Sequence, residues 1–190
     1  MAPGGARSRV GIITCCDARC SPEHFFRLAE NEVFVLRNGG GRALSDDIVR
    51  TLAVLQVATE IRELKVIHHT GCGGLKYTDE WVKAMIIKND PAAKNGAFLE
   101  GAKPWVESMV YLPFTPAKEG ATAKEILESS VVEDVLFLRN HPLVKPSIPI
   151  TGWIFSQETG LVEEVNCGLE DGCDPAQLEL LKQQLAKRDQ

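Results

Sequence analysis

Two short stretches of the sequence carry side chains that can bind a metal ion or act as nucleophiles. Residues 14–19 read TCCDAR, and residues 67–74 read IHHTGCGG. Cys15, His69 and Cys72 offer two thiolates and one imidazole, a donor set typical of zinc. A catalytic zinc uses three protein ligands and keeps its fourth position for water or substrate, whereas a structural zinc uses four. Three donors therefore predict a catalytic metal site.

The surrounding pattern predicts that these two stretches meet in the fold. Residues 9–15, 32–38 and 63–70 are short apolar runs rich in β-branched residues, which is typical of buried strands. Stretches with helical periodicity separate them, so we expect right-handed crossovers and a parallel sheet covered on both faces. Ligands gather beyond the carboxyl ends of such strands, where Cys15 and His69 lie. The expected fold class is α/β, with a mostly parallel central sheet flanked by helices.

Several helices are expected to begin at capping residues. Ser21 followed by proline predicts a helix start over residues 21–31, and Ser45 precedes a second helix with one apolar face. Thr78 opens a third helical stretch. Residues 124–131 also look helical, whereas residues 132–140 fit either a fourth strand or a continuation of that helix.

The remainder of the chain gives fewer signals. Residues 90–120 are rich in proline and glycine and carry little pattern. Residues 152–166 predict two strands around a Glu-Thr-Gly turn. A last helix is expected to begin at the capping pattern formed by Asp174, Pro175 and Gln177. Leu178, Leu181 and Leu185 would form its apolar face. No linker divides the chain, so we expect a single domain over residues 1–190.

The composition disfavours several classes of partner. The 190 residues carry a formal net charge of -5, which disfavours binding to phosphate backbones and anionic membrane surfaces. The longest apolar stretches, such as residues 51–58, are much shorter than the ~20 residues that span a bilayer. We therefore expect neither a nucleic acid nor a membrane as a partner.

The cysteines and the N-terminal residues suggest a location. Residues 1–10 read MAPGGARSRV and contain no apolar run of the kind found in secretory signals. Six cysteines are too sparse for a disulfide scaffold, so the thiols are expected to stay reduced. The expectation is a cytoplasmic protein, with import into an organelle left open.

The two stretches together resemble the signature of the β-class carbonic anhydrases. The matching motifs are C-x-D-x-R and H-x-x-C-G, formed here by Cys15, Asp17, Arg19, His69, Cys72 and Gly73. Residues 34–41 and 152–161 also resemble segments of that family. The resemblance implies one Zn2+ per chain held by Cys15, His69 and Cys72. It also implies a catalytic pair formed by Asp17 and Arg19, in a homodimer or a dimer of dimers.

The activity implied by the resemblance is reversible hydration of CO2 to bicarbonate and a proton by zinc-bound hydroxide. Two thiolates cancel the charge of zinc, so such a site should lower the pKa of bound water less than three histidines would. Asp17, held by Arg19, can accept a hydrogen bond from the hydroxide and aim it at CO2. Because the same carboxylate could occupy the open zinc position, we expect activity to rise with pH.

Other interpretations stay open at this stage. The same hydroxide could attack CS2 or COS, and Asp17 could close the metal permanently in a non-catalytic zinc or redox-sensing protein. A thiol phosphatase or reductase with Cys15 as its nucleophile would leave His69 and Cys72 unexplained. Cys16 and His68 are each displaced by one residue from the expected ligands, and strand alternation should turn them the other way.

Overall fold

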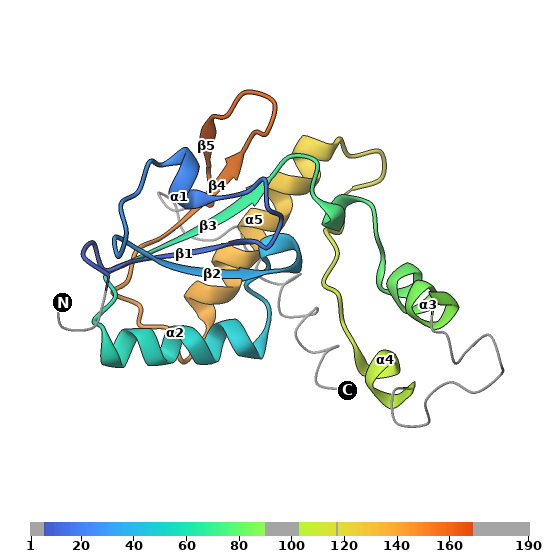
Figure 1. The fold of residues 1–190 in the computed structure, drawn as a ribbon, viewed down its shortest axis with the longest axis horizontal. Helices are drawn as coiled ribbons and strands as arrows, with labels where there is room; N and C mark the ends of the chain where they lie inside the picture. The colour runs from blue at the N-terminus through green and yellow to red at the C-terminus, as the bar shows by residue number, and fades with distance from the viewer. Residues whose placement is uncertain (1–5, 90–102, 117, 169–190) are drawn as a thin grey trace.

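The central sheet has five strands, and four of them are parallel (Figure 1). A computed structural model describes residues 6–89, 103–116 and 118–168. The sheet order is β2-β1-β3-β4-β5. The strands are β1 (Val10–Cys15), β2 (Phe34–Asn38), β3 (Glu63–His69), β4 (Ile150–Phe155) and β5 (Val162–Val165). Only β5 runs antiparallel to its neighbour. The predicted α/β class with a mostly parallel sheet is confirmed.

The connections between the strands are largely helical. The helices are α1 (Pro22–Phe25), α2 (Asp46–Ala58), α3 (Asp79–Asn89), α4 (Lys103–Ser108) and α5 (Ala123–Asn140). Of two 3-10 helices, η1 (Gly39–Gly41) follows β2 directly, and η2 (Gly73–Leu75) follows β3 after a short turn. Helix α5 runs unbroken through residues 132–140, so the continued helix is the correct alternative there. The predicted hairpin is formed by β4 and β5. The helix predicted around residues 174–185 lies outside the described residues.

The helix starts predicted at Ser21, Ser45 and Thr78 are confirmed, whereas the predicted length of the first helix is wrong. Ser45 accepts a hydrogen bond from the backbone N–H of Ile48, and Thr78 Oγ1 accepts one from the N–H of Trp81. Ser21 is the N-cap residue of α1, without a side-chain hydrogen bond, and Pro22 is the first residue of the helix. The helix ends at Phe25, however, much earlier than predicted. The reason is that Arg27 adopts a left-handed φ of 53°, which stops the helix.

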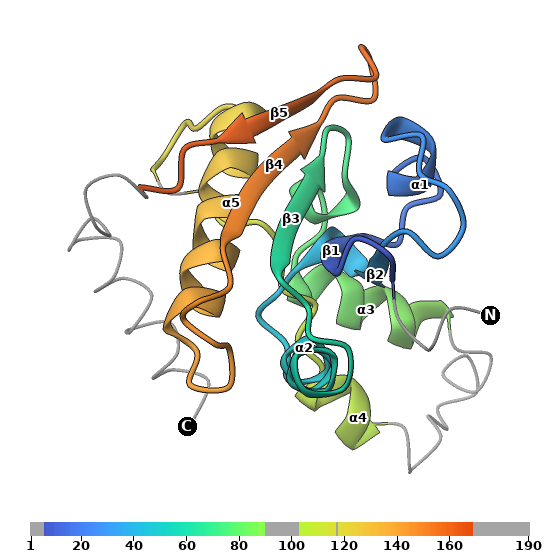
Figure 2. The same ribbon diagram turned by 90° about the vertical axis from the view of Figure 1, so that its left-hand side faces the viewer.

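The helices cover the two faces of the sheet unequally. Figure 2 shows α5 and α1 on opposite sides of it. The crossovers from β2 to β3 and from β3 to β4 run in one direction across the sheet, whereas the crossover from β1 to β2 runs in the other. Right-handed connections therefore place α2 and α5 on one face and α1 on the other. On the α1 face, Phe25 stacks on Phe155, but Lys65 and Trp153 stay partly exposed. The predicted cover of both faces is thus only partial on this side.

Helices α3 and α4 form an arm that projects from the rest of the chain (Figure 1). Lys83 Nζ donates a hydrogen bond to the carbonyl of Glu107 and joins the two helices. No residue of α3 is buried, and Trp105 of α4 is 78% exposed. Among the described ranges, no helix combines the length and apolarity needed to cross a membrane.

Candidate metal centre

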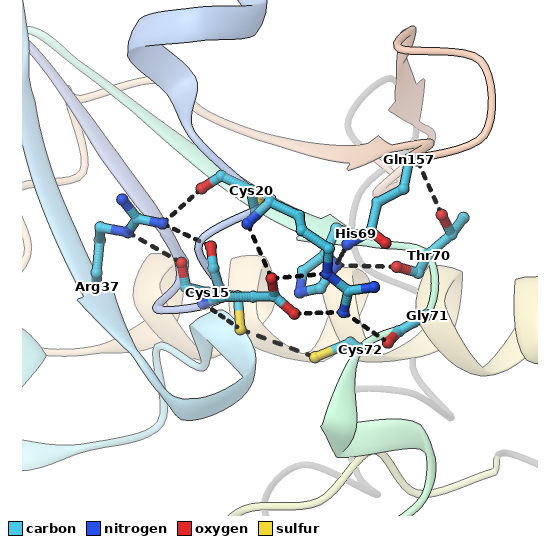
Figure 3. Close-up of polar contacts among 10 residues, drawn as sticks. Cys15, Cys20, Arg37, His69, Thr70, Gly71, Cys72 and Gln157 are labelled. Carbon is cyan, nitrogen blue, oxygen red and sulfur yellow. Dashed lines mark hydrogen bonds and ion pairs between the residues drawn. The ribbon is translucent and has the colours of Figure 1, made fainter.

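Three potential ligand atoms converge beyond the carboxyl ends of β1 and β3 (Figure 3). The Sγ atoms of Cys15 and Cys72 and a ring nitrogen of His69 all lie within 4.8 Å of one another, and all three residues are buried. The two Sγ atoms are 3.9 Å apart. Two thiolates on one tetrahedral zinc, each ~2.3 Å from the ion, would be separated by about 3.8 Å. The spacing therefore fits one shared metal ion.

His69 presents one ring nitrogen without a protein partner. Its Nε2 is buried and makes no hydrogen bond, whereas Nδ1 lies 2.9 Å from the carbonyl oxygen of Thr70. A carbonyl oxygen only accepts, so Nδ1 must carry the proton and Nε2 keeps its lone pair. The amide nitrogen of Gln157 lies 2.7 Å from Nδ1. Turning this amide over by 180° brings its oxygen to Nδ1, where it can accept the same proton. A buried lone pair with no donor is what a metal ligand presents.

The two thiols are coupled through their short contact. The hydrogen bond from Cys72 lowers the pKa of Cys15, and the same contact, together with burial, raises the pKa of Cys72. The backbone N–H of Asp17 also donates to Cys15 Sγ, at 3.4 Å. The contact therefore favours ionisation of Cys15 over ionisation of Cys72. A bound divalent ion would allow both thiols to ionise.

Asp17 and Arg19 form a two-point ion pair beside this cluster. Arg19 Nε donates to Oδ1 at 2.9 Å and Nη2 donates to Oδ2 at 2.6 Å. The Arg19 backbone N–H donates to Oδ1 as well, at 2.9 Å. Hydrogen bonding from Arg19 holds the pKa of the Asp17 carboxyl well below its usual range, so the group is ionised at neutral pH. The structure thus brings the pair expected from the sequence together.

Two neighbouring segments fix the loop that carries Cys15. Arg37 in β2 donates hydrogen bonds to the carbonyl oxygens of Cys15, Asp17 and Cys20, at 3.0, 2.8 and 2.7 Å. Gly41 has φ 71°, and a Cβ there would lie 2.6 Å from the backbone nitrogen of Cys15. The glycine is therefore needed for the turn and for its close approach to the end of β1.

The residues displaced by one position turn away, as strand alternation predicted. Cys16 is exposed. His68 is fully buried, with Nδ1 2.7 Å from Ser130 Oγ and Nε2 2.9 Å from Asp134 Oδ2 in α5.

Two residues beside the cluster, Gln157 and Tyr111, could not be recognised from the sequence. Gln157 contacts His69 from the hairpin, two residues after Phe155, which pairs with His69 across β3 and β4. The only sequence signal for Gln157 was its position as a polar residue just past the end of a predicted strand.

Tyr111 lies in the segment after α4, where the sequence shows no pattern. Its hydroxyl is 3.4 Å from where a Cβ on Gly73 would be. Burial and then the charges of Cys72 and Cys15 raise the pKa of its phenol.

The comparison with protein families decides which family has this site. A family model described as carbonic anhydrase matches residues 10–162, which contain the whole cluster and the ion pair. The chain belongs to the carbonic anhydrase family. The resemblance of its two motifs to the β class is confirmed by its similarity to proteins of that class.

Proteins that are similar to this chain differ in the activity for which they are named. The carbonic anhydrase from Glaciozyma antarctica is 31% identical in sequence with a TM-score of 0.71, covering 86% of this chain and 85% of that one. Beta-carbonic anhydrase 1 of Mycobacterium tuberculosis is 38% identical over 77 residues, or 40% of this chain and 47% of that protein. Carbon disulfide hydrolase of Acidianus sp. (strain A1-3) is 25% identical over 172 residues, covering 83% of this chain and 78% of that protein.

Proposed function

We propose that this chain is a zinc-dependent carbonic anhydrase that hydrates CO2 reversibly to bicarbonate and a proton. The observation that carries the proposal is the buried Cys15, His69 and Cys72 cluster with an ionised Asp17 beside it. Family membership supports the same reaction class.

The three residues of the cluster would hold the ion through both sulfurs and His69 Nε2. Zinc bound there would lower the pKa of a coordinated water and so supply the nucleophile, although two thiolates would lower that pKa less than three histidines would. The carbonyl of Thr70 keeps the proton of His69 on Nδ1, so the imidazole can serve as a neutral ligand.

Asp17 would act on the attacking water. Its carboxylate can accept a hydrogen bond and so orient the water's lone pair, because the group stays ionised. Arg19 engages both carboxylate oxygens, which favours a held orientation over movement onto the metal. This geometry supports an open catalytic site rather than a non-catalytic zinc or redox-sensing protein closed by Asp17.

Metal analysis combined with stopped-flow CO2 hydration tests the proposal. We expect about one zinc per chain and CO2 hydration that follows the zinc content. Cys72→Ser should strip the zinc and the activity together, because a three-ligand site loses one of its two thiolates. Cys167→Ser, which changes a buried cysteine outside the cluster, should keep both. Zinc binding without hydration between pH 6.5 and 9 would refute the proposal.

Hydrolysis of CS2 or COS is the second candidate on the same site. The observation in its favour is the similarity to carbon disulfide hydrolase, which spans more of this chain than the match to the mycobacterial carbonic anhydrase does. Release of hydrogen sulfide from CS2 or COS, measured beside CO2 hydration on one preparation, separates the two. Turnover of CS2 or COS without CO2 hydration would assign the chain to the hydrolases.

We also propose that the chain forms a homodimer or a dimer of dimers. The supporting features are the arm, whose helix α3 exposes Trp81 and Ile87, and the partly exposed Trp153 on the α1 face. Apolar surface of this kind is typical of contacts between subunits.

A further inference from the structure

A cluster of buried polar and charged side chains, centred on Asp134, lies next to the metal centre without touching it. Asp134 in α5 is fully buried and accepts a hydrogen bond at each oxygen. His68 Nε2 lies 2.9 Å from Oδ2, and Arg42 Nε donates to Oδ1 at 3.1 Å. Arg42 also pairs with Glu133, donates to the carbonyl of Pro113 at 3.2 Å and is itself only 2% exposed.

An aromatic ring completes this cluster. Phe114 stacks on His68 with ring centroids 4.9 Å apart and interplanar angle 16°. The guanidinium carbon of Arg42 lies 5.5 Å from the centroid of the same ring. Three segments far apart in the sequence thus meet at Asp134: the turn after β2, the end of β3, and the segment that returns from α4.

Burying these charged side chains costs free energy of folding. Taking a carboxylate and a guanidinium out of water costs several kcal/mol per ion, and well-packed apolar residues often stabilise a core equally well. The sheet already has an extensive apolar core around it. Stability alone is therefore a weak reason to place Asp134 and Arg42 there.

Each of the three segments leads directly to one residue of the metal cluster. Arg42 follows the glycine turn, in which Gly41 packs against the backbone of Cys15. His68 is the immediate neighbour of His69. The backbone N–H of Phe114 donates to the carbonyl of Gly74 at 3.0 Å. The Phe114 ring also lies 3.1 Å from where a Cβ on Gly74 would be, close behind Cys72.

We propose that Asp134 is the hub of a positioning network, formed with His68, Arg42 and Phe114, that sets the spacing of Cys15, His69 and Cys72 and thereby the affinity for zinc. None of the four makes a hydrogen bond or an ion pair with a ligand atom, so they act through the backbone segments that they hold. The inference rests on the proposed zinc site.

Asp134→Asn tests the network most directly, because it keeps the size of the side chain and removes its charge. Arg42 keeps Glu133 as a partner in this variant. We expect zinc affinity, measured by competition with a chelator, to fall about tenfold or more, in the range seen when outer-shell partners of metal ligands are lost. The absorption bands of the cobalt-substituted chain should also shift, because they report the geometry of the thiolate ligands.

Gln56→Ala provides a matched control for simple loss of stability. Gln56 is buried and holds the Leu143 carbonyl and the Lys145 N–H, outside the network and outside the metal cluster. This variant should unfold at a lower temperature yet bind zinc within about twofold of the wild type, since its lost hydrogen bonds are remote from the ligands. Equal losses of zinc affinity in the control and in Asp134→Asn would overturn the proposal.

Phe114→Leu provides a second test if Asp134→Asn does not fold. It loosens the stack on His68 and leaves no buried charge unpaired, and it should also weaken zinc binding while Gln56→Ala does not. If Asp134→Asn binds zinc as tightly as the wild type, the network is refuted and the proposed zinc site is left intact. The same holds for Phe114→Leu if Asp134→Asn does not fold. A wild-type chain that binds no zinc would refute both.

Discussion

Arg19 holds both carboxylate oxygens of Asp17, with Nε 2.9 Å from Oδ1 and Nη2 2.6 Å from Oδ2. The Arg19 side chain is 61% exposed, whereas that of Asp17 is 21% exposed. An ion pair this close to solvent adds little to stability. The ion pair instead fixes the orientation of the Asp17 carboxylate, because two parallel hydrogen bonds from the Arg19 side chain and one from its backbone N–H hold it.

Arg19→Lys should therefore impair catalysis without removing the metal. A lysine keeps the charge but cannot make the two-point contact, so Asp17 loses its fixed orientation. We expect kcat/KM for CO2 hydration to fall roughly 10- to 100-fold, by analogy with other outer-shell changes. Zinc content should stay at one ion per chain. Stopped-flow rates and metal analysis of the same preparation check this, and loss of zinc in the variant would contradict it.

Gln157→Leu should weaken zinc binding through His69. The variant removes the side-chain amide at Nδ1, so only the Thr70 carbonyl remains to hold the ring and its tautomer. We expect about tenfold lower affinity for zinc in a chelator competition assay. Leu161→Ala is the matched control, because it changes an exposed residue of the same hairpin. The prediction fails if both variants bind zinc equally well.

The metal cluster could be predicted from the sequence because each donor sits at, or just after, the end of a strand with a clear apolar pattern. Strand alternation separates Cys15 from Cys16 and His69 from His68, and the structure places all four side chains accordingly. These inferences rested on local patterns, on the rule that parallel strands end at the same edge of a sheet, and on the resemblance of C-x-D-x-R and H-x-x-C-G to a family signature.

The surroundings of the cluster could not be predicted, for physical reasons that differ from residue to residue. Asp134 contacts His68 only after α5 packs on the sheet, a long-range contact that no local pattern encodes. Tyr111 lies in an extended segment without periodicity. The early end of α1 depends on a left-handed Arg27, a residue type that gives no signal for that conformation.

Glu125 is expected to make the stability of the fold depend on pH in acid. The hydrogen bond from Lys118, followed by those from Thr122 at the start of α5, lowers the Glu125 pKa from 4.5 to about 2. A carboxyl with a lowered pKa stabilises the folded state above its unfolded pKa, and this contribution disappears as the pH falls from about 4.5 to about 2. Thermal unfolding should show Glu125→Gln melting below the wild type at pH 7. An equal difference at pH 2 would contradict the explanation.

Trp105→Ser should shift the proposed dimer toward the monomer. Trp105 is 78% exposed on the arm, so its loss should cost the isolated chain little stability, whereas a buried interface tryptophan is a frequent hot spot worth about 2 kcal/mol or more. That figure corresponds to a roughly 30-fold weaker association, since about 1.4 kcal/mol is a tenfold change. Light scattering with size-exclusion chromatography over a range of concentrations measures it. Val57→Ser, on the 81% exposed Val57 of α2, is the control for a general loss of apolar surface. If the Trp105 variant associates as tightly as the wild type, the arm is not part of the interface. If the wild type is a monomer, the proposed dimer is refuted.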